Sequence, residues 1–491
     1  MKPLSAPSPF SFVLFGASGN LAKLKIYPAL YVLALKKRFP ENYAIVGYAR
    51  TEMNDMEFRK LVEESIRAQM LEVNAKTLEN FLSHCHYVSG QYDSKKDFQA
   101  LSKRLTTIEK GWKKAVRLAY LSIPPTVFTQ VLDNICEGGV HPSTDSGQGD
   151  TKVPFRCIVE KPVGHDLKSF EEIQTQLQKC FTDEEIYLLD HYLGKEAVRN
   201  VYYLRFANPM LERLFKNSLI HHVEVTASES YGLEGRSGYF EHTGMLRDMF
   251  QSHLLMMTSL LTMHIKESES ALRESRLRAL QQFYLPPATD LSEVILQAQY
   301  SKGKVHDETV IGYREEEDIP KDSRTNTYAA MKLLSREARW QGVPFYLRSG
   351  KRLSKKETRI SLQFQEPHAV GEGSTPNRLD IILQGEAGMR VHLQTKIGGT
   401  TPSFRPLILE DPLVCMGDCL PEHGLLLLEA IHGMQTWFLT FDEVRTAWRL
   451  IDPLQSYIDK KTTPLYFYPA GGNGPDEAAG WAAKDGVKWM V

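Results

Sequence analysis

Three short stretches of the 491-residue chain concentrate side chains that could carry out acid–base chemistry on a charged substrate. They are Glu160-Lys161-Pro162-Val163-Gly164, Asp190-His191-Tyr192-Leu193-Gly194-Lys195-Glu196 and Arg247-Asp248-Met249-Phe250-Gln251-Ser252-His253. A neutral histidine accepts a proton near neutral pH, and a carboxylate can hold its ring in the required tautomer. Lysine ammonium groups attract an anion. The alternative for His253 is a core residue of a Met- and Leu-rich helix, and Asp248 could instead cap that helix or pair with Arg247.

A glycine-containing turn, Gly16-Ala17-Ser18-Gly19-Asn20-Leu21-Ala22, follows the apolar run Phe10–Phe15 and opens a helical stretch. Glycines allow a tight turn and the close approach of a pyrophosphate, which the free amides of a helix N-terminus attract. Two such glycines alone also fit an ordinary strand-to-helix turn. A second apolar run, Tyr43–Tyr48, completes the βαβ unit of a dinucleotide-binding fold and favours that interpretation.

Arg50 follows this second run, at the position where NAD-dependent folds place an acid that binds the ribose hydroxyls. A cation there, with the hydroxyl of Thr51 beside it, favours the 2′-phosphate of NADP. The alternative is a solvated loop residue, and the nearby acids Glu52 and Asp55 weaken the inference.

The segments that must position these residues differ between the two halves of the chain. In the first half, apolar runs at Phe10–Phe15, Tyr43–Tyr48, Val116–Ile123 and Phe155–Val159 alternate with amphipathic stretches such as Phe58–Met70 and Lys95–Lys103. This alternation predicts an α/β fold with a doubly wound parallel sheet, that is, a Rossmann-like NADP-binding domain over residues 1–190.

The second half predicts a larger α+β domain over residues 191–491, with roles in substrate binding and oligomerisation. A helical stretch at Met245–Met263 precedes strand candidates separated by Gly or Pro turns, which suit a mostly antiparallel sheet. The candidates are Val294–Tyr300, Arg359–Phe364, Leu379–Leu383, Met389–Gln394 and Leu425–Ala430. Asp248 and His253 are five residues apart, about 140° around a regular helix, so they flank a groove or the helix is locally distorted.

The composition excludes several classes of protein. Lys and Arg total 59 against 60 for Asp and Glu, so the net charge of −1 provides no general attraction for nucleic acid or an acidic membrane. The six cysteines show no CxxC pair, so we expect neither a zinc site nor a disulfide framework, and no metal. The apolar run near the N-terminus is too short for a signal peptide or a membrane span, which favours a cytoplasmic protein.

Taken together, the motifs resemble those of the glucose-6-phosphate dehydrogenase family. The resemblance includes Arg348-Ser349-Gly350-Lys351 and runs nearly from end to end of the chain. It passes through Leu204-Arg205-Phe206-Ala207-Asn208, Glu234-Gly235-Arg236-Ser237-Gly238-Tyr239-Phe240, Ala447-Trp448-Arg449 and Gly474-Pro475. The stretch from Asp190 to Glu196 is the most specific of these motifs.

The resemblance implies oxidation of glucose 6-phosphate to 6-phosphogluconolactone with NADP⁺, the first step of the oxidative pentose phosphate pathway. It implies His253 as the general base and Asp190 as the carboxylate that orients it. The substrate phosphate would bind His191, Tyr192, Lys195 and Lys356, and the sugar hydroxyls would bind Lys161, Glu229, Asp248 and Lys351. The implied cofactor-binding residues are Gly16, Ala17, Ser18, Gly19, Asn20, Leu21, Arg50, Pro124 and Lys161.

The family also implies a homodimer or homotetramer formed through the large sheet. Two departures from its pattern bear on the cofactor. Asn20 replaces an Asp common in the family, which bears on cofactor affinity, and Glu357 and Ser361 stand where a second, structural NADP site has cations, so we expect no such site. The alternatives are another NADP-linked sugar-phosphate oxidoreductase, which would lack the Asp190–Lys195 stretch, and a non-catalytic sensor, which would lack the base or the phosphate cation.

Overall fold

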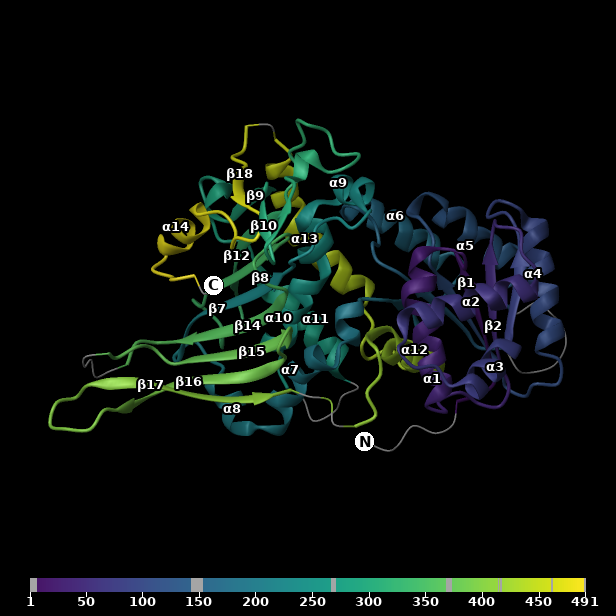
Figure 1. Cartoon of the computed structure of the whole chain (residues 1–491), viewed down its shortest axis with the longest axis horizontal. Coiled ribbons are helices and arrows are strands. Elements are labelled where there is room, and N and C mark those ends of the chain that lie inside the picture. Colours follow the sequence, from purple (N-terminus) through teal and green to yellow (C-terminus); the bar gives the residue numbers. More distant parts are fainter. Residues whose placement is uncertain are drawn as a thin grey trace. The chain divides into compact units, whose positions relative to one another are not determined.

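The computed structural model describes residues 7–142, 153–265, 271–367, 373–413, 415, 417–460 and 462–489. They form two compact units, whose elements are labelled in Figure 1. The first unit extends to Lys195 and takes in Gly417–Phe441, and the second unit takes the remaining described residues.

The first unit is built on a parallel sheet whose described strands run in the order β3-β2-β1-β4-β5-β6. The strands are β1 (Phe10–Phe15), β2 (Tyr43–Ala49), β3 (Cys85–Ser89), β4 (Val116–Leu121), β5 (Phe155–Val159) and β6 (Ile186–Leu188). Every neighbouring pair is parallel. This strand order, with the sequence reversing direction beside β1, is that of a doubly wound dinucleotide-binding fold. The predicted Rossmann-like sheet is therefore confirmed.

Helices connect these strands, and most begin at a capping residue. They are α1 (Tyr27–Leu35), α2 (Asp55–Gln69), α3 (Ala75–Ser83), α4 (Lys95–Ile108), α5 (Phe128–Glu137) and α6 (Leu167–Gln178). At the start of α2, Asn54 accepts the backbone N–H of Glu57, whose carboxylate in turn accepts the backbone N–H of Asn54. Such a capping box satisfies two backbone donors that the helix cannot pair itself. The predicted helical stretches in this half lie in α2 and α4.

One predicted strand of the second half is wrong, because Leu425–Ala430 lies inside helix α12 (Glu422–His432) of the first unit. The helix ends where Gly433 adopts a left-handed conformation with φ of 78°. Its leucines are buried on nearly all sides, so the sequence shows no polar face and no helical period there. α12 packs against α1, β4 and the short helix η4 (His191–Gly194).

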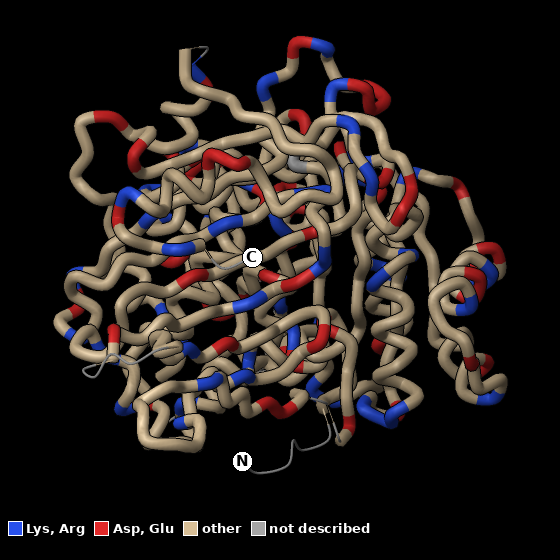
Figure 2. The backbone as a smooth tube through the Cα atoms, turned by 60° about the vertical axis from the view of Figure 1, so that its left-hand side comes forward, with Lys and Arg blue, Asp and Glu red and all other residues tan. Residues whose placement is uncertain are grey.

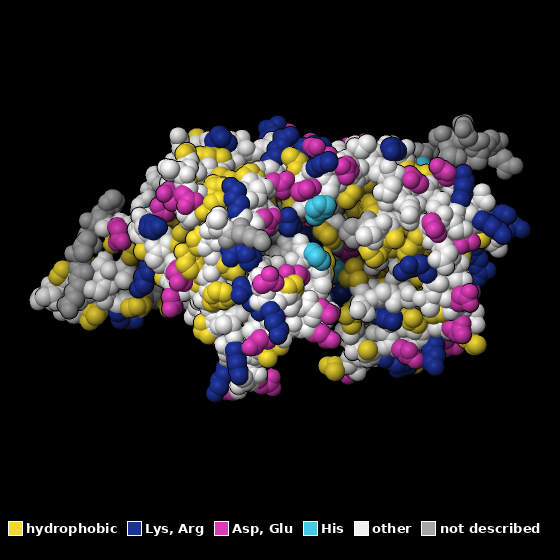
Figure 3. All heavy atoms as spheres, turned by 90° about the horizontal axis from the view of Figure 1, so that it is seen from above, with side chains coloured by type: hydrophobic (Ala, Val, Ile, Leu, Met, Phe, Trp, Pro, Cys, Tyr) yellow, Lys and Arg dark blue, Asp and Glu magenta, His cyan; other side chains and the backbone are white. Residues whose placement is uncertain are grey.

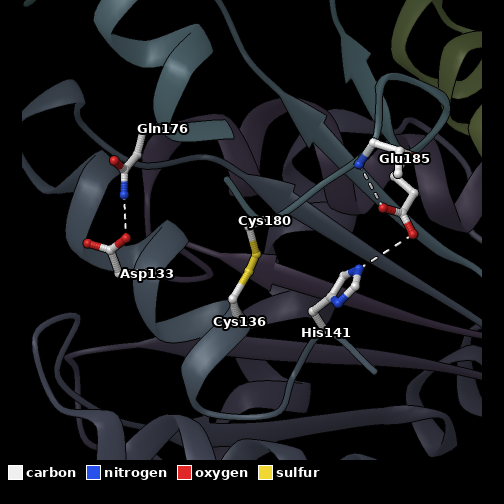
Figure 4. The surroundings of a disulfide bond; sticks show 7 residues. Asp133, Cys136, His141, Gln176, Cys180 and Glu185 are labelled. Carbon is white, nitrogen blue, oxygen red and sulfur yellow. Dashed lines mark hydrogen bonds and ion pairs between the residues drawn. A yellow bond between two sulfur atoms is a disulfide. The ribbon is translucent and has the colours of Figure 1, made fainter. Parts of the chain in front are cut away.

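The expectation of no disulfide framework is also wrong. Cys136, in α5, and Cys180, just after α6, form a disulfide with their Cα atoms 6.1 Å apart (Figure 4). Beside it, the side chain of Gln176 donates to Asp133 from one helix to the other. The two cysteines are separated by 44 positions in the sequence and belong to no spacing motif, so only the packing of α5 on α6 reveals the pair.

The second unit contains a larger sheet, whose described strands run in the order β17-β16-β15-β14-β7-β13-β12-β9-β18. They are β7 (Ile220–Ser228), β9 (Ile295–Ser301), β12 (Tyr328–Ser335), β13 (Phe345–Gly350), β14 (Glu357–Phe364), β15 (Arg378–Gln384), β16 (Gly388–Lys396), β17 (Phe404–Pro412) and β18 (Tyr466–Pro469), with β8 (Phe283–Tyr284) paired to β12. Pairing is antiparallel except for β7 with β13 and β9 with β18. The predicted mostly antiparallel sheet is confirmed.

Helices of the second unit cover this sheet. They are α7 (Glu196–Ala207), α8 (Pro209–Leu214), α9 (Ser237–Met245), α10 (Leu255–Thr262), α11 (Leu272–Gln282), α13 (Phe441–Ile458) and α14 (Glu477–Ala483), and a small hairpin consists of β10 (Gly303–Val305) and β11 (Glu308–Val310). α10 is buried along its whole length and packs against α7 and α11 (Figure 1). Between α9 and α10 the chain forms a π-helical segment, η5 (Leu246–Leu254).

Charged residues of both signs are interspersed along the backbone in Figure 2. On the face drawn in Figure 3, Lys and Arg side chains are likewise mixed with Asp and Glu. Binding of an anionic substrate therefore depends on local groups of cations. Within the described ranges, no helix combines the length and apolar character needed to cross a membrane, and no group of three or more His, Cys, Asp or Glu could hold a metal ion.

Candidate active site

The glycine turn of the first unit lies at the carboxyl end of β1. Gly16 has φ of +84°, and a Cβ atom built there would lie 2.0 Å from the carbonyl oxygen of Ser122. Only glycine fits, because that φ and that contact both exclude a side chain. The Gly16 N–H donates to the Tyr48 carbonyl over 3.0 Å, and the Gly19 N–H donates to the Gly16 carbonyl over 2.9 Å. The turn, at which a dinucleotide pyrophosphate would bind, is thus tied to the end of β2.

Arg50 and Thr51 follow β2 directly and lie beside this turn. The hydroxyls of Ser18 and Thr51 are 3.1 Å apart. The Arg50 guanidinium is exposed and lies 5.6 Å from the centre of the Tyr92 ring. The structure therefore brings the predicted 2′-phosphate cation and the predicted pyrophosphate turn to one edge of the sheet. Tyr92 was not predicted as part of this group.

A pocket lies beside the carboxyl end of β5. Its lining consists of Ile123, Phe128, Val159, Glu160, Lys161, Pro162, Val163 and Ile173. Lys161 thus faces a cavity of the first unit, and Pro124 directly follows one of its lining residues. A mostly apolar pocket with one cation suits a flat ring next to a polar group.

The stretch after β6 carries four of the predicted site residues on one short turn. Asp190 is fully buried, and its carboxylate accepts the backbone N–H of Tyr192 over 2.9 Å at the start of η4. Lys195 lies with its Nζ 3.7 Å from the centre of the Tyr192 ring. The turn therefore presents His191, Tyr192 and Lys195 together, as the predicted phosphate site requires.

Two residues of α12, which the sequence analysis did not predict, complete the surroundings of this turn. Glu422 Oε1 lies 3.7 Å from His191 Nδ1, and the buried ring of His423 stacks against that of His191 with 6.1 Å between centroids. The adjacent Glu422-His423 pair was visible in the sequence, but nothing in its spacing connected it to the Asp190–Lys195 stretch.

In the second unit, His253 is 4% exposed and lies near the end of η5. Its Nδ1 is 3.5 Å from the hydroxyl of Ser252. Because a π-helix pairs residues five apart, Asp248 and His253 lie on nearly the same side of the segment. The alternative of a locally distorted helix is therefore the correct one. Burial, followed by the charge of Asp248, raises the pKa of Tyr239 to about 12.

The other predicted residues of the second unit gather around Tyr231. The Lys351 ammonium lies 2.6 Å from Glu229 Oε2, and the Tyr231 hydroxyl donates to Glu229 Oε1 over 2.6 Å. Lys356 Nζ lies 5.1 Å from the centre of the Tyr231 ring. Glu229 follows β7 and Lys351 follows β13, and η5 packs against both strands. Tyr231 was missed because it belongs to no charged motif.

The fold and these two sets of residues are typical of one class of protein. A doubly wound sheet with a glycine turn, followed by an α+β unit that carries polar residues at its strand ends, defines a dinucleotide-dependent oxidoreductase. The family models "Glucose-6-phosphate dehydrogenase, NAD binding domain" and "Glucose-6-phosphate dehydrogenase, C-terminal domain" match residues 13–200 and 202–490. The chain therefore belongs to the glucose-6-phosphate dehydrogenase family, as the motifs predicted.

Relatives and solved structures agree with this assignment. Glucose-6-phosphate 1-dehydrogenase of Chlamydia pneumoniae is 34% identical over 503 residues, covering 99% of this chain and 97% of its own. The Aspergillus niger enzyme of that name is 36% identical, covering 97% of this chain and 92% of its own. A glucose-6-phosphate dehydrogenase solved with its substrate glucose-6-phosphate superposes with a TM-score of 0.87 at 30% identity, covering 99% of this chain and 100% of that one. The structure of glucose-6-phosphate 1-dehydrogenase from Mycobacterium avium superposes with a TM-score of 0.82 at 25% identity, and 99% of both chains is covered.

Proposed function

We propose that this chain oxidises D-glucose 6-phosphate to 6-phospho-D-glucono-1,5-lactone with NADP⁺, the first step of the oxidative pentose phosphate pathway. The observation that carries the proposal is the η4 turn, which holds His191, Tyr192 and Lys195 together after the last strand of a dinucleotide-binding sheet. A phosphate dianion needs hydrogen-bond donors, and a positively charged donor such as Lys195 binds it most strongly. Membership of the family supports glucose as the sugar.

The residues present fit the cofactor. The Gly16 turn follows β1 at the position where a dinucleotide-binding fold holds the pyrophosphate, and Arg50 is an exposed cation that follows β2. We propose that Gly16, Ala17, Ser18, Gly19, Asn20, Leu21, Arg50, Pro124 and Lys161 hold NADP⁺. When bound, the nicotinamide supplies the acceptor for hydride.

The protein's own residues have separate proposed roles. His253 accepts the proton of the anomeric hydroxyl, and the carboxylate of Asp190 favours the imidazolium so formed. His191, Tyr192, Lys195 and Lys356 bind the phosphate. Lys161, Glu229, Asp248 and Lys351 bind the sugar hydroxyls, which fixes the anomeric hydrogen in one direction. Residues 1–190 are the proposed NADP-binding domain, and residues 191–491 the proposed domain for substrate binding and oligomerisation.

The direct test is the absorbance of reduced nicotinamide, recorded with glucose 6-phosphate and either NADP⁺ or NAD⁺ and no added metal. We expect a rise with NADP⁺ and a weaker rise with NAD⁺. A comparable rise with NAD⁺ would retain the reaction but contradict NADP selectivity. No rise with either cofactor would indicate a different sugar phosphate or a sensor.

We also propose a homodimer or homotetramer that forms through the large sheet. β17 is the last described strand at one edge of that sheet, and Ile408 and Leu409 on it are each 52% exposed. An exposed apolar edge strand favours pairing with a further copy. Light scattering coupled to size exclusion should give an oligomer for the wild type and a smaller species for Leu409→Lys. A monomeric wild type would contradict the proposal.

The proposed location is the cytoplasm, and the disulfide offers a test of it. Disulfides are uncommon in a reducing cytosol, whereas Cys136 and Cys180 are bonded and each partly exposed. Rapid alkylation of cell lysate followed by mass spectrometry should find both cysteines as free thiols if the protein is cytoplasmic. A fully oxidised pair would indicate an oxidising compartment.

A further inference from the structure

The first unit contains a connected group of acidic and histidine side chains that the proposed mechanism does not use. We name it the His–Glu cluster, and its members are Glu160, His191, Glu422 and His423. His191 comes from η4, Glu422 and His423 begin α12, and Glu160 follows β5. The three segments are far apart in the sequence but pack together in one unit.

The approach of α12 to η4 depends on a glycine. A Cβ atom at Gly194 would lie 2.4 Å from the carbonyl oxygen of Glu422. Any side chain there would push the N-terminus of α12 away from the turn. The close packing therefore places the Glu422 and His423 side chains directly against His191.

The contacts within the cluster run in sequence. Glu422 Oε1 lies 3.7 Å from both His191 Nδ1 and His423 Nδ1. His423 Nε2 lies 3.8 Å from Glu160 Oε1, and the Tyr120 hydroxyl donates to the same carboxylate. Glu422 therefore contacts both imidazoles. His423 also contacts Glu160, which precedes Lys161 in the pocket lining.

The charges of the cluster follow from its surroundings. Burial alone would raise the pKa of Glu422, but the nearby His191, Lys195 and His423 side chains outweigh it and lower the pKa to about 2. Burial, then the charge of His191, lowers the pKa of His423 to about 4, and Lys25 contributes in the same direction. Near neutral pH, Glu422 is therefore ionised and His423 is neutral. Burial raises the pKa of Glu160.

We propose that Glu422 is a positioning residue that orients the His191 ring toward the substrate phosphate. This inference rests on the proposed role of His191 in phosphate binding. The groups around His191 are Tyr192 and Lys195 on its own turn, Glu422 and His423 on α12, and Glu160 and Asp190 at the strand ends. Among the α12 residues that contact His191, Glu422 is the anion.

The test compares full-length wild type with Glu422→Gln. We expect the KM for glucose 6-phosphate to rise about 5- to 10-fold with kcat changed less than about 2-fold, since ground-state binding is lost. The KM for NADP⁺ should stay unchanged. Glu422→Asp, which keeps the carboxylate, should restore most of the lost affinity for glucose 6-phosphate.

A double-mutant cycle with His191→Gln separates the possible failures. If Glu422 acts through His191, then Glu422→Gln should have no further effect on KM in the His191→Gln background. An equal effect in both backgrounds would overturn the inference and leave the phosphate role of His191 intact. An unchanged KM in His191→Gln alone would contradict that role and the inference with it. His432→Gln, at the other end of α12, is the matched control and should change none of these values.

Discussion

The ammonium group of Lys351 lies 2.6 Å from the carboxylate of Glu229, and both side chains are almost entirely buried. The pair exists because β7 and β13 are adjacent and parallel, with Ser228 opposite Gly350 in the register. The residue that follows each strand therefore emerges at the same edge. The ammonium also lies 4.9 Å from the centre of the Phe240 ring, so aromatic side chains shield the pair from water.

Breaking this pair should destabilise the second unit. Glu229→Gln leaves the Lys351 charge buried without its carboxylate, which costs about 3–5 kcal/mol in comparable sites. We expect a lower midpoint of thermal unfolding by calorimetry. Glu229→Gln combined with Lys351→Met removes both charges and should recover much of the loss. If the double variant is the less stable one, the pair does not act as a unit.

Replacing the proposed base should affect the chemical step. His253→Asn should lower kcat by at least about 10²-fold and leave the KM for glucose 6-phosphate nearly unchanged, because the side chain acts in proton transfer. Steady-state absorbance measurements give both constants. His242→Asn, an exposed histidine on the preceding helix α9, is the matched control. Near wild-type turnover in His253→Asn would return His253 to the role of a core residue.

Removing the cation beside the glycine turn should change the choice of cofactor. Arg50→Ala should raise the KM for NADP⁺ about 10- to 100-fold, because one or two charge-assisted hydrogen bonds to the 2′-phosphate are lost. The KM for NAD⁺, which lacks this phosphate, should stay nearly unchanged. Arg67→Ala, an exposed arginine at the end of α2, serves as control. An unaltered NADP⁺ to NAD⁺ preference would make Arg50 an ordinary surface residue.

The sequence predicted the strands whose apolar runs are buried on both faces. β1, β2 and β4 are buried at every position, and such continuous runs mark a parallel sheet. By contrast, β3 is only partly buried and β6 has three residues, so neither produced a clear run. In the second unit, β7 buries His222, Glu224 and Thr226. Polar residues that find partners only in the folded sheet hide a strand from sequence patterns.

The candidate site was predictable where its residues form a continuous motif. The Asp190–Lys195 stretch and the Gly16 turn each lie in one short segment, so their spacing carries the information. Tyr231, Glu422 and His423 were missed because tertiary packing alone brings them to the motif residues. The Cys136–Cys180 disulfide was missed for the same reason.

That disulfide should stabilise the first unit under oxidising conditions. The cysteines are 44 positions apart. A cross-link that closes a loop of this size lowers the entropy of the unfolded chain, which raises the free energy of unfolding by about 3–4 kcal/mol. Adding a dithiol reductant should therefore lower the midpoint of thermal unfolding of the wild type. The variant with Cys136→Ser and Cys180→Ser should already unfold at the lower temperature and should not respond to reductant. Equal responses of both proteins would show that the bond has no part in stability.

His423 should make the stability of the first unit depend on pH. Its pKa is lowered to about 4 in the folded protein, chiefly by burial, against an ordinary value of 6.5. The unfolded chain therefore binds a proton more readily than the folded one between these values. The free energy of unfolding is therefore highest above pH 6.5. It falls by at most about 3 kcal/mol as the pH drops toward 4. Urea unfolding at pH 7 and pH 5 should show this loss in the wild type and a smaller one in His423→Gln. The exposed His165→Gln should behave as the wild type, and identical pH dependence in all three proteins would mean that His423 does not remain neutral in the folded state.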